Sequence, residues 1–287
     1  MKKLITTISL LALFVTSASA ADLEYKVHRA GANGFNLASV LVTGEKEAVL
    51  IDAHFTKADA HKVVAQILES GKELKTIYVS HGDPDFYFGL PVIKQAFPNA
   101  EVFASNPTIK YIKKTYNKKL GFWGPKLGVN GSNYIILPKP LKGDTIKLED
   151  KELKVMGLDS KYPERSYVYV PSIKAVFGGI NVFDKMHLWM ADSKTKDARV
   201  SWLEVLNTMS KLDIKTVVST HAGKETTSNK ESIEFTKQYL ITYEKAVSKS
   251  KNSKELISIM QKAYPNLNNK SFILSLGAKV TKGEMKW

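Results

Sequence analysis

The amino-acid sequence predicts an α/β (α+β) fold, a four-layer αββα sandwich with a C-terminal helical extension. Strand-like and helix-like segments alternate in two successive halves, each with its strands first. That order indicates two mixed sheets with helices on their outer faces. The 287 residues suit one large domain with an appendage. Hydrophobic residues make up 44% and charged residues 24%, as in an ordinary globular protein, so disorder of the whole chain is excluded.

The first 20 residues have the pattern of a secretory signal peptide. A basic start at Lys2 and Lys3 precedes an apolar run over residues 4–15, and the small residues 18–20 resemble a cleavage site. The apolar run is too short to span a bilayer comfortably, which disfavours a retained anchor. We therefore expect cleavage after Ala20, a periplasmic or secreted protein, and no membrane span in the remaining chain.

The first half of the chain opens with strands. Apolar alternation and apolar runs predict strands at residues 24–28, 36–42, 47–52, 76–79 and 101–104. The helical spacing of apolar residues predicts helices at residues 58–70, 90–97 and 107–118. Gly71 is expected to end the first helix. Residues 121–125, Gly-Phe-Trp-Gly-Pro, are expected to form a rigid aromatic loop.

The second half repeats this order of strands and helices. Strands are predicted within residues 133–155 and at 167–170, 175–177 and 216–219. Helices are predicted at residues 200–212, 232–249 and 253–263. The chain thus divides into a signal peptide (1–20), a domain (21–223) and a C-terminal helical extension (224–287). We expect the extension to cover a face of the domain or to mediate pairing into a homodimer.

Residues 80–89, Ser-His-Gly-Asp-Pro-Asp-Phe-Tyr-Phe-Gly, follow an apolar strand and precede a predicted helix. His81, Asp83 and Asp85 fall at i, i+2 and i+4, a pattern that suits a hard-metal site or an acid/base site. The same residues also suit a strand-to-helix turn, in which Asp83 or Asp85 caps the helix and Pro84 stiffens the loop. The local pattern leaves both interpretations open.

Two further histidines are placed where functional groups of α/β folds are found. His221 directly follows a predicted strand, and His187 precedes a predicted helix. The remaining histidines are less well placed: His28, His54 and His61. His187 is equally well explained as a packed side chain beside Trp189.

Composition excludes several classes of function. The sequence has no cysteine, so any metal must be bound by His, Asp or Glu, and disulfides and cysteine nucleophiles are excluded. The net charge of +14 becomes +14 − 2 = +12 without Lys2 and Lys3. No basic stripe interleaved with aromatic residues is present, so no specific nucleic-acid binding is expected. The sequence also lacks a Gly-x-Ser-x-Gly elbow and a phosphate-binding glycine loop.

The order of these features resembles that of the metallo-β-lactamase superfamily over about residues 23–223. An early strand ends in Asp52, and residues 81–86 with the following Gly89 match the loop written His-x-His-x-Asp-His. A late histidine of the family is matched by His221. The run His-Gly-Asp-Pro-Asp-Phe is similar to that of an exported branch of the superfamily. The resemblance implies the αββα fold, a hydrolase activity and a divalent metal.

The chain also departs from the family pattern at several ligand positions. Asp83 stands at the second histidine of the loop and Phe86 at its last ligand. Further along the chain, Asp159 stands at the mid-chain histidine and Ile180 at the bridging aspartate. Because Phe and Ile cannot coordinate a metal, the usual two-metal site is not expected.

The remaining donors predict a reduced site that binds a single divalent metal. The candidate ligands are His81, Asp83, Asp85, His187 and His221. One Zn is the expected cofactor, with Mn or Fe(II) as alternatives. Asp85 and His187 are the candidate catalytic residues, because each would position or deprotonate the reacting water if it is not a ligand.

The expected function is therefore the hydrolysis of a small-molecule substrate, an ester, lactone, amide or phosphoester. The alternative is a non-catalytic small-molecule-binding protein on the same fold. Its aromatic pocket would be lined by Phe86, Tyr87, Phe88, Trp123 and Trp189.

Overall fold

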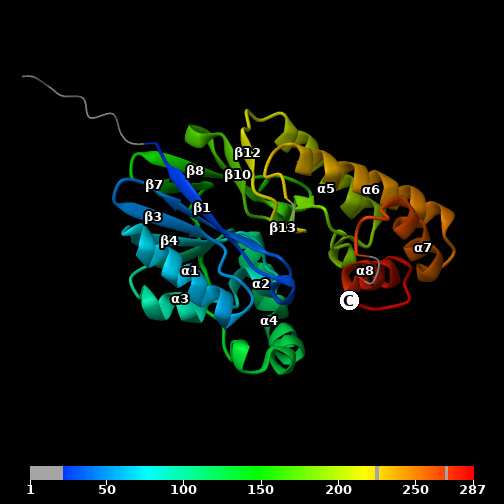
Figure 1. The fold of residues 1–287 in the computed structure, drawn as a ribbon, viewed down its shortest axis with the longest axis horizontal. Helices are drawn as coiled ribbons and strands as arrows, with labels where there is room; N and C mark the ends of the chain where they lie inside the picture. Colours follow the sequence, from blue (N-terminus) through cyan, green and yellow to red (C-terminus); the bar gives the residue numbers. More distant parts are fainter. Residues whose placement is uncertain (1–21, 224–225, 269–270) are drawn as a thin grey trace, which may run out of the picture.

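The computed structural model describes residues 22–223, 226–268 and 271–287. The expected signal peptide and its cleavage site lie outside these residues. Over the described residues, helices and strands alternate in two halves and form a layered α/β structure (Figure 1). The predicted fold class is confirmed by this arrangement.

The first sheet is built from the strands of the first half. It has the order β1-β2-β3-β4-β5-β6. Its strands are β1 (Glu24–Arg29), β2 (Ala38–Thr43), β3 (Glu47–Ile51), β4 (Glu73–Val79), β5 (Glu101–Ala104) and β6 (Lys139–Pro140). The strands β1, β2 and β3 pair antiparallel, whereas β3, β4, β5 and β6 pair parallel, so the sheet is mixed. Parallel pairing brings the carboxyl ends of β3 and β4 to the same edge.

The second sheet is built from the second half and is also mixed. It has the order β12-β10-β9-β8-β7. Its strands are β7 (Thr145–Leu148), β8 (Lys151–Met156), β9 (Tyr167–Val170), β10 (Ala175–Phe177) and β12 (Thr216–Val217). A separate parallel pair, β11 (Phe183–Asp184) with β13 (His221–Ala222), extends toward the carboxyl edge of the first sheet.

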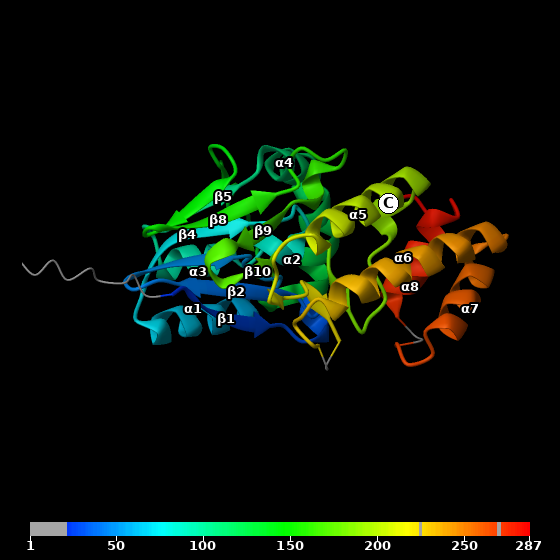
Figure 2. The same ribbon diagram turned by 90° about the horizontal axis from the view of Figure 1, so that it is seen from above.

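Two apolar cores hold these layers together. One lies between the sheets, where Val49 and Ile51 of the first sheet pack with Val155, Val168 and Phe177 of the second. The other lies on the outer faces and includes buried residues of the helices α1 (Lys57–Ser70), α3 (Leu90–Ala96) and α5 (Lys196–Ser210). Figures 1 and 2 show α1 and α3 on one side of the sheets and α5 on the other. This is the predicted order of four layers.

Helix α4 (Asn106–Leu127) is longer than the sequence predicts. The aromatic loop expected at residues 121–125 is wrong, because these residues continue the helix to Leu127. Pro125 lies inside the last turn, where it cannot donate a hydrogen bond to the preceding turn, and the helix ends two residues later at Leu127. Trp123 and Leu127 are partly buried against the outer core, and this packing outweighs the helix-breaking tendency of Gly121 and Gly124.

Two of the C-terminal helices, α6 (Glu231–Lys249) and α7 (Ser253–Ala263), occur where the sequence predicts them, and a third, α8 (Phe272–Thr281), follows where no helix was predicted. Helix α6 packs on the domain, since Thr236 Oγ1 accepts the Phe183 N–H at 3.0 Å and donates to the Phe183 carbonyl at 2.9 Å. Among the described helices, none has the length and apolar character needed to cross a membrane.

Candidate functional site

A buried carboxylate fixes the start of the loop that follows β4. Asp52 is fully buried after β3, and its carboxylate accepts the Ser80 N–H at 2.8 Å and the Ser80 hydroxyl at 2.6 Å. The Ser80 Oγ in turn accepts the Gly179 N–H at 2.7 Å. At Gly178, with φ of +64°, an added Cβ would lie 2.9 Å from Ser80. Asp52 therefore joins both sheets at the edge where His81 emerges.

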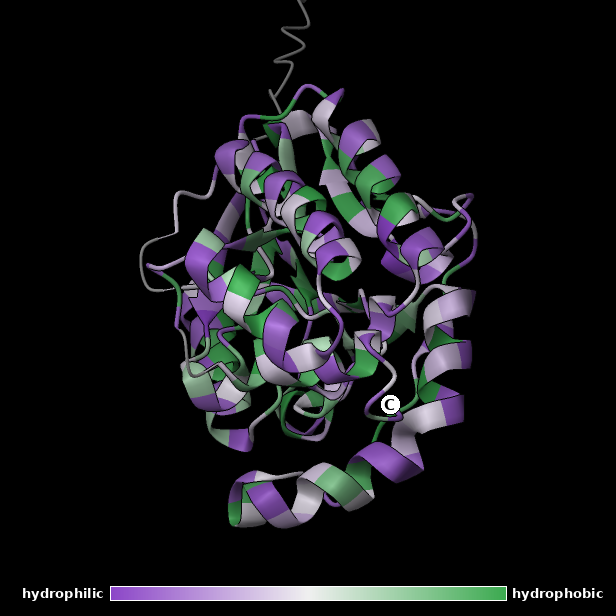
Figure 3. Cartoon of the chain, turned by 90° about the vertical axis from the view of Figure 1, so that its right-hand side faces the viewer, coloured by the Kyte–Doolittle hydropathy of each residue, from purple (hydrophilic) through white to green (hydrophobic). Residues whose placement is uncertain are grey.

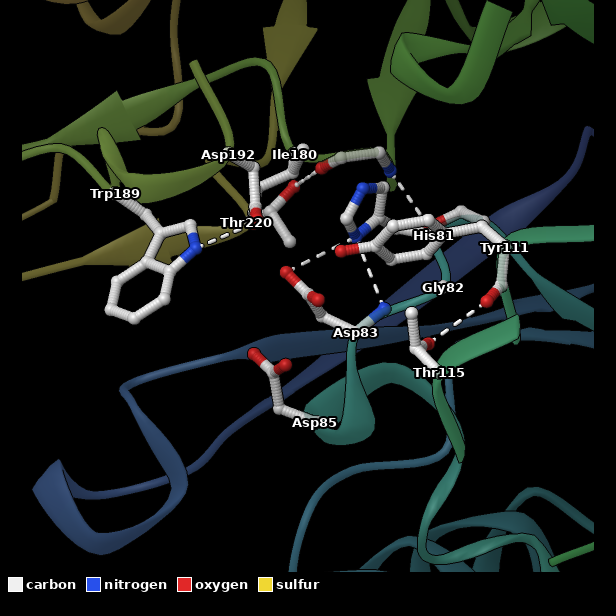
Figure 4. A network of polar contacts seen from close by, with 12 residues as sticks. His81, Gly82, Asp83, Asp85, Tyr111, Thr115, Ile180, Trp189, Asp192 and Thr220 are labelled. Carbon is white, nitrogen blue, oxygen red and sulfur yellow. Dashed lines mark hydrogen bonds and ion pairs between the residues drawn. The ribbon is translucent and has the colours of Figure 1, made fainter. Parts of the chain in front are cut away.

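The loop after Ser80 turns immediately into a short helix, α2 (Pro84–Tyr87). Pro84 occupies the first helical position, which suits its fixed φ and its missing N–H. The turn directs Asp83 and Asp85 to the same side as His81, as Figure 4 shows. The three residues are 4% (His81), 8% (Asp83) and 6% (Asp85) exposed. Asp83 stands at the N-cap position of this helix without a side-chain capping hydrogen bond, and both acidic residues gather beside His81.

His221 reaches the same place from the second half of the chain. Its strand β13 pairs with β11 in a register that places His221 opposite Phe183, and the two rings stack with centroids 5.1 Å apart. The His221 Nδ1 donates to the Phe35 carbonyl at 2.9 Å, since a carbonyl can only accept. This leaves Nε2 free to act as a base, and it lies 3.4 Å from the Asp85 Oδ2. His221 is thus brought beside Asp85, in the loop that also carries His81.

Lys119 of helix α4 enters this cluster as a cation. Its Nζ lies 2.5 Å from the Asp83 Oδ1 and donates to the Gly82 carbonyl at 3.2 Å. It also lies 4.4 Å from the centroid of the Tyr111 ring. The side chains of Lys119 and Asp83 are 13% and 12% exposed, so the pair is largely shielded from water. Because they keep this residual exposure, they mark the solvent side of the cluster.

Burial sets the protonation of the remaining groups. It lowers the pKa of His81 to about 4 and that of His221 to about 4, so both imidazoles are neutral at neutral pH. Burial and the negative charge of Asp83 raise the pKa of Asp85 well above its ordinary value. Burial alone would also raise the pKa of Asp83, but the Lys119 ammonium holds it below its ordinary value. The cluster therefore pairs the Asp83 carboxylate with Lys119 and places beside His221 a carboxyl group whose ionisation burial disfavours.

An aromatic ring packs against both histidines. Phe86 is fully buried, with its ring centroid 5.1 Å from that of His81 and 5.9 Å from that of His221. Ile180 is 4% exposed, and its carbonyl accepts the Arg165 Nη1 at 2.8 Å. Asp159 is exposed and takes no part in the cluster. The apolar residues that the sequence places at two ligand positions are thus core side chains.

As arranged, these residues do not fit the single divalent metal that the sequence predicts. The Asp83 carboxylate is engaged by an ammonium group, and the Phe86 ring packs against both imidazoles that would have to converge on one ion. Within residues 22–223, 226–268 and 271–287, no three His, Asp or Glu side chains are grouped to bind a metal ion. A site for one Zn, Mn or Fe(II) would require Lys119 to leave Asp83.

Several polar residues around the cluster have no signal in the sequence. Arg165 is 5% exposed, and burial lowers its pKa to about 10. Its guanidinium stacks on the Trp202 ring at 3.7 Å and donates to the Ser193 hydroxyl at 2.7 Å. Asp192 accepts the Trp189 indole N–H at 2.7 Å, beside the cluster in Figure 4. Lys119 likewise has no signal of its own, since it is one of several lysines on a basic helix.

His187 does not join the cluster. Its Nδ1 lies 2.8 Å from the Tyr239 hydroxyl of α6, and its Nε2 has no hydrogen-bond partner among the described residues. The residue is 1% exposed. The sequence left open whether His187 is a functional residue or a side chain packed beside Trp189. These contacts agree with a packed side chain, whose neighbour is Tyr239.

Because burial lowers the pKa of His187 to about 4, this residue should destabilise the fold in acid. An unfolded histidine titrates near 6.5, so protons favour the unfolded state as the pH falls from about 6.5 toward 4. His187→Gln keeps a polar partner for Tyr239 but cannot be protonated. Between about pH 7 and pH 5 the variant should lose about 2 kcal/mol less stability than the wild type. Urea unfolding at both pH values measures this difference, and parallel pH profiles would contradict it.

Comparison with known proteins gives one family and a set of similar structures. The sequence model described as the metallo-beta-lactamase superfamily matches residues 33–221. No sequence among the curated proteins matches the chain.

Solved structures of the same fold resemble this chain at low sequence identity. A metallo-beta-lactamase family protein from Thermus thermophilus has a TM-score of 0.62 and 15% identity, over 91% of each chain. A beta-lactamase domain protein from Burkholderia ambifaria has a TM-score of 0.63 and 13% identity, over 92% of this chain and 86% of that one. A metallo-beta-lactamase from Pontibacter korlensis has a TM-score of 0.56 and 18% identity, over 78% of this chain and 97% of that one. These likenesses show the fold.

Proposed function

Because the chain belongs to the metallo-beta-lactamase superfamily, we propose that it is a hydrolase of a small ester, lactone, amide or phosphoester in which Lys119 supplies the positive charge of the site. Members of the superfamily generally bind divalent metals such as Zn, whereas here the described donors do not fit an ion. The observation that carries the proposal is the Lys119 ammonium 2.5 Å from Asp83, inside the cluster of His81, Asp85 and His221.

Lys119 is suited to stabilise an oxygen that becomes negative during hydrolysis. An ammonium has three N–H donors, and the Asp83 carboxylate and the Gly82 carbonyl account for two of them. The third is available to a carbonyl or phosphoryl oxygen of the substrate. A fixed charge in a largely water-free site acts more strongly than the same charge in bulk water.

Asp85 and His221 supply an acid and a base for the same step. The His221 Nε2 accepts a proton from water, and the water oxygen bonds to the carbon or phosphorus atom of the substrate. The bond to the leaving group breaks, and the Asp85 carboxyl donates its proton to that group. A proton then passes from His221 to Asp85 across their 3.4 Å separation and restores the starting state. Water is thereby divided between the two products, with no other reactant.

The test is hydrolysis with and without a chelator. The purified protein should hydrolyse members of a chromogenic panel of esters, lactones, amides and phosphoesters equally well in EDTA. Asp85→Asn should lower kcat by about 100-fold, because it removes the acid while keeping the shape of the side chain. The matched control is Asp159→Asn, an exposed residue outside the cluster, which should leave kcat unchanged.

Elemental analysis distinguishes this proposal from the single-metal hydrolase. Activity that requires one equivalent of Zn, Mn or Fe(II) would overturn the role given to Lys119 and support the metal site expected from the sequence. Equal kcat in the wild type and Asp85→Asn would also contradict the proposal.

The second candidate is a non-catalytic small-molecule-binding protein, since the closure of the cluster disfavours catalysis there; Phe86, Tyr87 and Phe88 of its expected pocket are buried core side chains. His81, Asp83, Asp85 and His221 are all buried. Two surface hollows of about 560 Å³ and 350 Å³ lie beside α8 and between α5 and α6, and neither is lined by a cluster residue. If the whole panel is inert while a ligand quenches the fluorescence of Trp123 or Trp189, this candidate replaces the hydrolase.

A further inference from the structure

Helix α4 and the segment after it carry positively charged side chains and no negatively charged ones. Residues 102–143 contain no aspartate or glutamate, in a protein whose net charge is +14. The same stretch contains eight lysines: Lys110, Lys113, Lys114, Lys118, Lys119, Lys126, Lys139 and Lys142. Lys119 pairs with Asp83, and Lys139 pairs with Glu101. Within the part of the chain that the structure describes, the other six take part in no ion pair.

Four of these unpaired lysines lie on one exposed side of α4. Lys110, Lys113, Lys114 and Lys118 are all exposed, and their spacing of three or four residues places them on adjacent turns of one helix face. Repulsion between like charges makes such a row unfavourable for an isolated helix. The row therefore creates a local positive potential that an anionic partner would relieve.

Exposed apolar side chains lie near the end of the same helix, at Phe122 and Val129, and in the segment that leads from it to β6, at Tyr134 and Leu137. Phe122 is 43% exposed, Val129 95%, Tyr134 60% and Leu137 43%. Lys126 lies over the Phe122 ring, 3.6 Å from its centroid. Figures 1 and 3 show the end of α4 at the lower extremity of the molecule, away from the sheets. Apolar side chains at a projecting end, with lysines directly behind them, are the arrangement of a protein that lies on a lipid surface.

We propose that the α4 surface, defined as the exposed lysines of α4 together with Phe122, Val129, Tyr134 and Leu137, docks onto an anionic lipid bilayer. The apolar tip enters the headgroup region, and the lysine row contacts the anionic headgroups. The Phe122 and Tyr134 rings suit a stacked base as well as a lipid, but the exposed Val129 and Leu137 favour a lipid partner over a nucleic acid. This inference is independent of the proposed hydrolase activity, although the opposite face of α4 carries Lys119.

The test is sedimentation with vesicles, using residues 21–287, which contain every described helix and strand. The expected signal peptide is left out because its own basic and apolar residues would bind lipid. The protein should sediment with vesicles of phosphatidylcholine mixed with phosphatidylglycerol and not with phosphatidylcholine alone. Raising the salt concentration should release it, because exposed charges are screened.

Two pairs of variants separate the charge from the apolar tip. Lys110→Glu/Lys113→Glu/Lys114→Glu should weaken partitioning by at least about tenfold, since each lysine near an anionic surface contributes measurably to binding. The matched control reverses three exposed lysines elsewhere, Lys245→Glu/Lys249→Glu/Lys254→Glu, and should retain most binding.

The second pair tests the apolar tip. Phe122→Ser/Val129→Ser should weaken partitioning by about tenfold. Leu68→Ser/Val200→Ser changes two exposed apolar residues outside the α4 surface and should have little effect.

Four results would overturn the proposal. They are no binding to the anionic vesicles, equal binding to neutral vesicles, equal losses in both lysine triples, and full binding by Phe122→Ser/Val129→Ser. If duplex DNA or heparin binds as tightly as the vesicles and the apolar variant binds them normally, the surface recognises polyanions in general, and the lipid assignment fails.

Discussion

Replacing Lys119 by methionine is expected to lower the free energy of unfolding by about 3 kcal/mol. Methionine keeps the apolar stem of the lysine side chain but removes the ammonium from the Asp83 carboxylate, which is 2.5 Å away. Breaking a buried ion pair by removing one partner is costly, because it leaves the other charge shielded from water and unpaired. Urea unfolding at neutral pH measures the loss of stability.

The double variant Lys119→Met/Asp83→Asn is the matched control. It removes both charges, so no uncompensated carboxylate remains, and most of the lost stability should return. The double-mutant cycle isolates the coupling between the two side chains from their packing. If the double variant is as unstable as Lys119→Met, the loss comes from packing of the lysine stem, and the pairing of the two charges is not its cause.

Asp52→Ala is expected to lower the free energy of unfolding by about 4 kcal/mol. The change leaves the N–H and hydroxyl of Ser80 without their acceptor in a fully buried place, and each unsatisfied donor costs about 1–3 kcal/mol. Asp52 also has φ of +66°, a conformation that Asp tolerates better than Ala. Thermal and urea unfolding both report this loss.

Asp52→Asn is the informative comparison. Asparagine keeps an acceptor oxygen for Ser80 and tolerates positive φ, so the variant should lose less than half as much stability as Asp52→Ala. Because the Ser80 hydroxyl also accepts the Gly179 N–H, Asp52→Ala should disturb the contact between the sheets as well. Equal losses in the two variants would show that the hydrogen bonds of Asp52 are not the source of its effect.

The fold could be predicted from sequence because its signals are local. The alternation of strand and helix segments and the position of Gly71 at a helix end are properties of neighbouring residues. The end of α4 was mispredicted because local and tertiary signals conflict there. Gly121, Gly124 and Pro125 favour a loop, whereas the burial of Trp123 and Leu127 favours the helix that forms.

The site was predicted in part for the same reason. His81, Asp83 and Asp85 follow β4, and His221 lies in the short strand β13, so topology brings them together. The pattern of strands and the family resemblance together singled them out in the sequence. Lys119 resembles any other lysine of a basic helix, and only the tertiary fold places it on Asp83. His187 shows the opposite error, since its position before a helix suggests a functional loop while the fold turns it toward Tyr239.

The position of the ammonium beside Asp83 makes the positive charge of this site independent of any dissolved ion. A dissociable ion occupies its site according to its free concentration, so dilution or depletion empties it. Lys119 is part of helix α4, so every folded chain places one ammonium group beside Asp83, and the geometry of the fold sets its effective concentration there. Folding therefore supplies this positive charge whatever the concentration of metal ions in the medium.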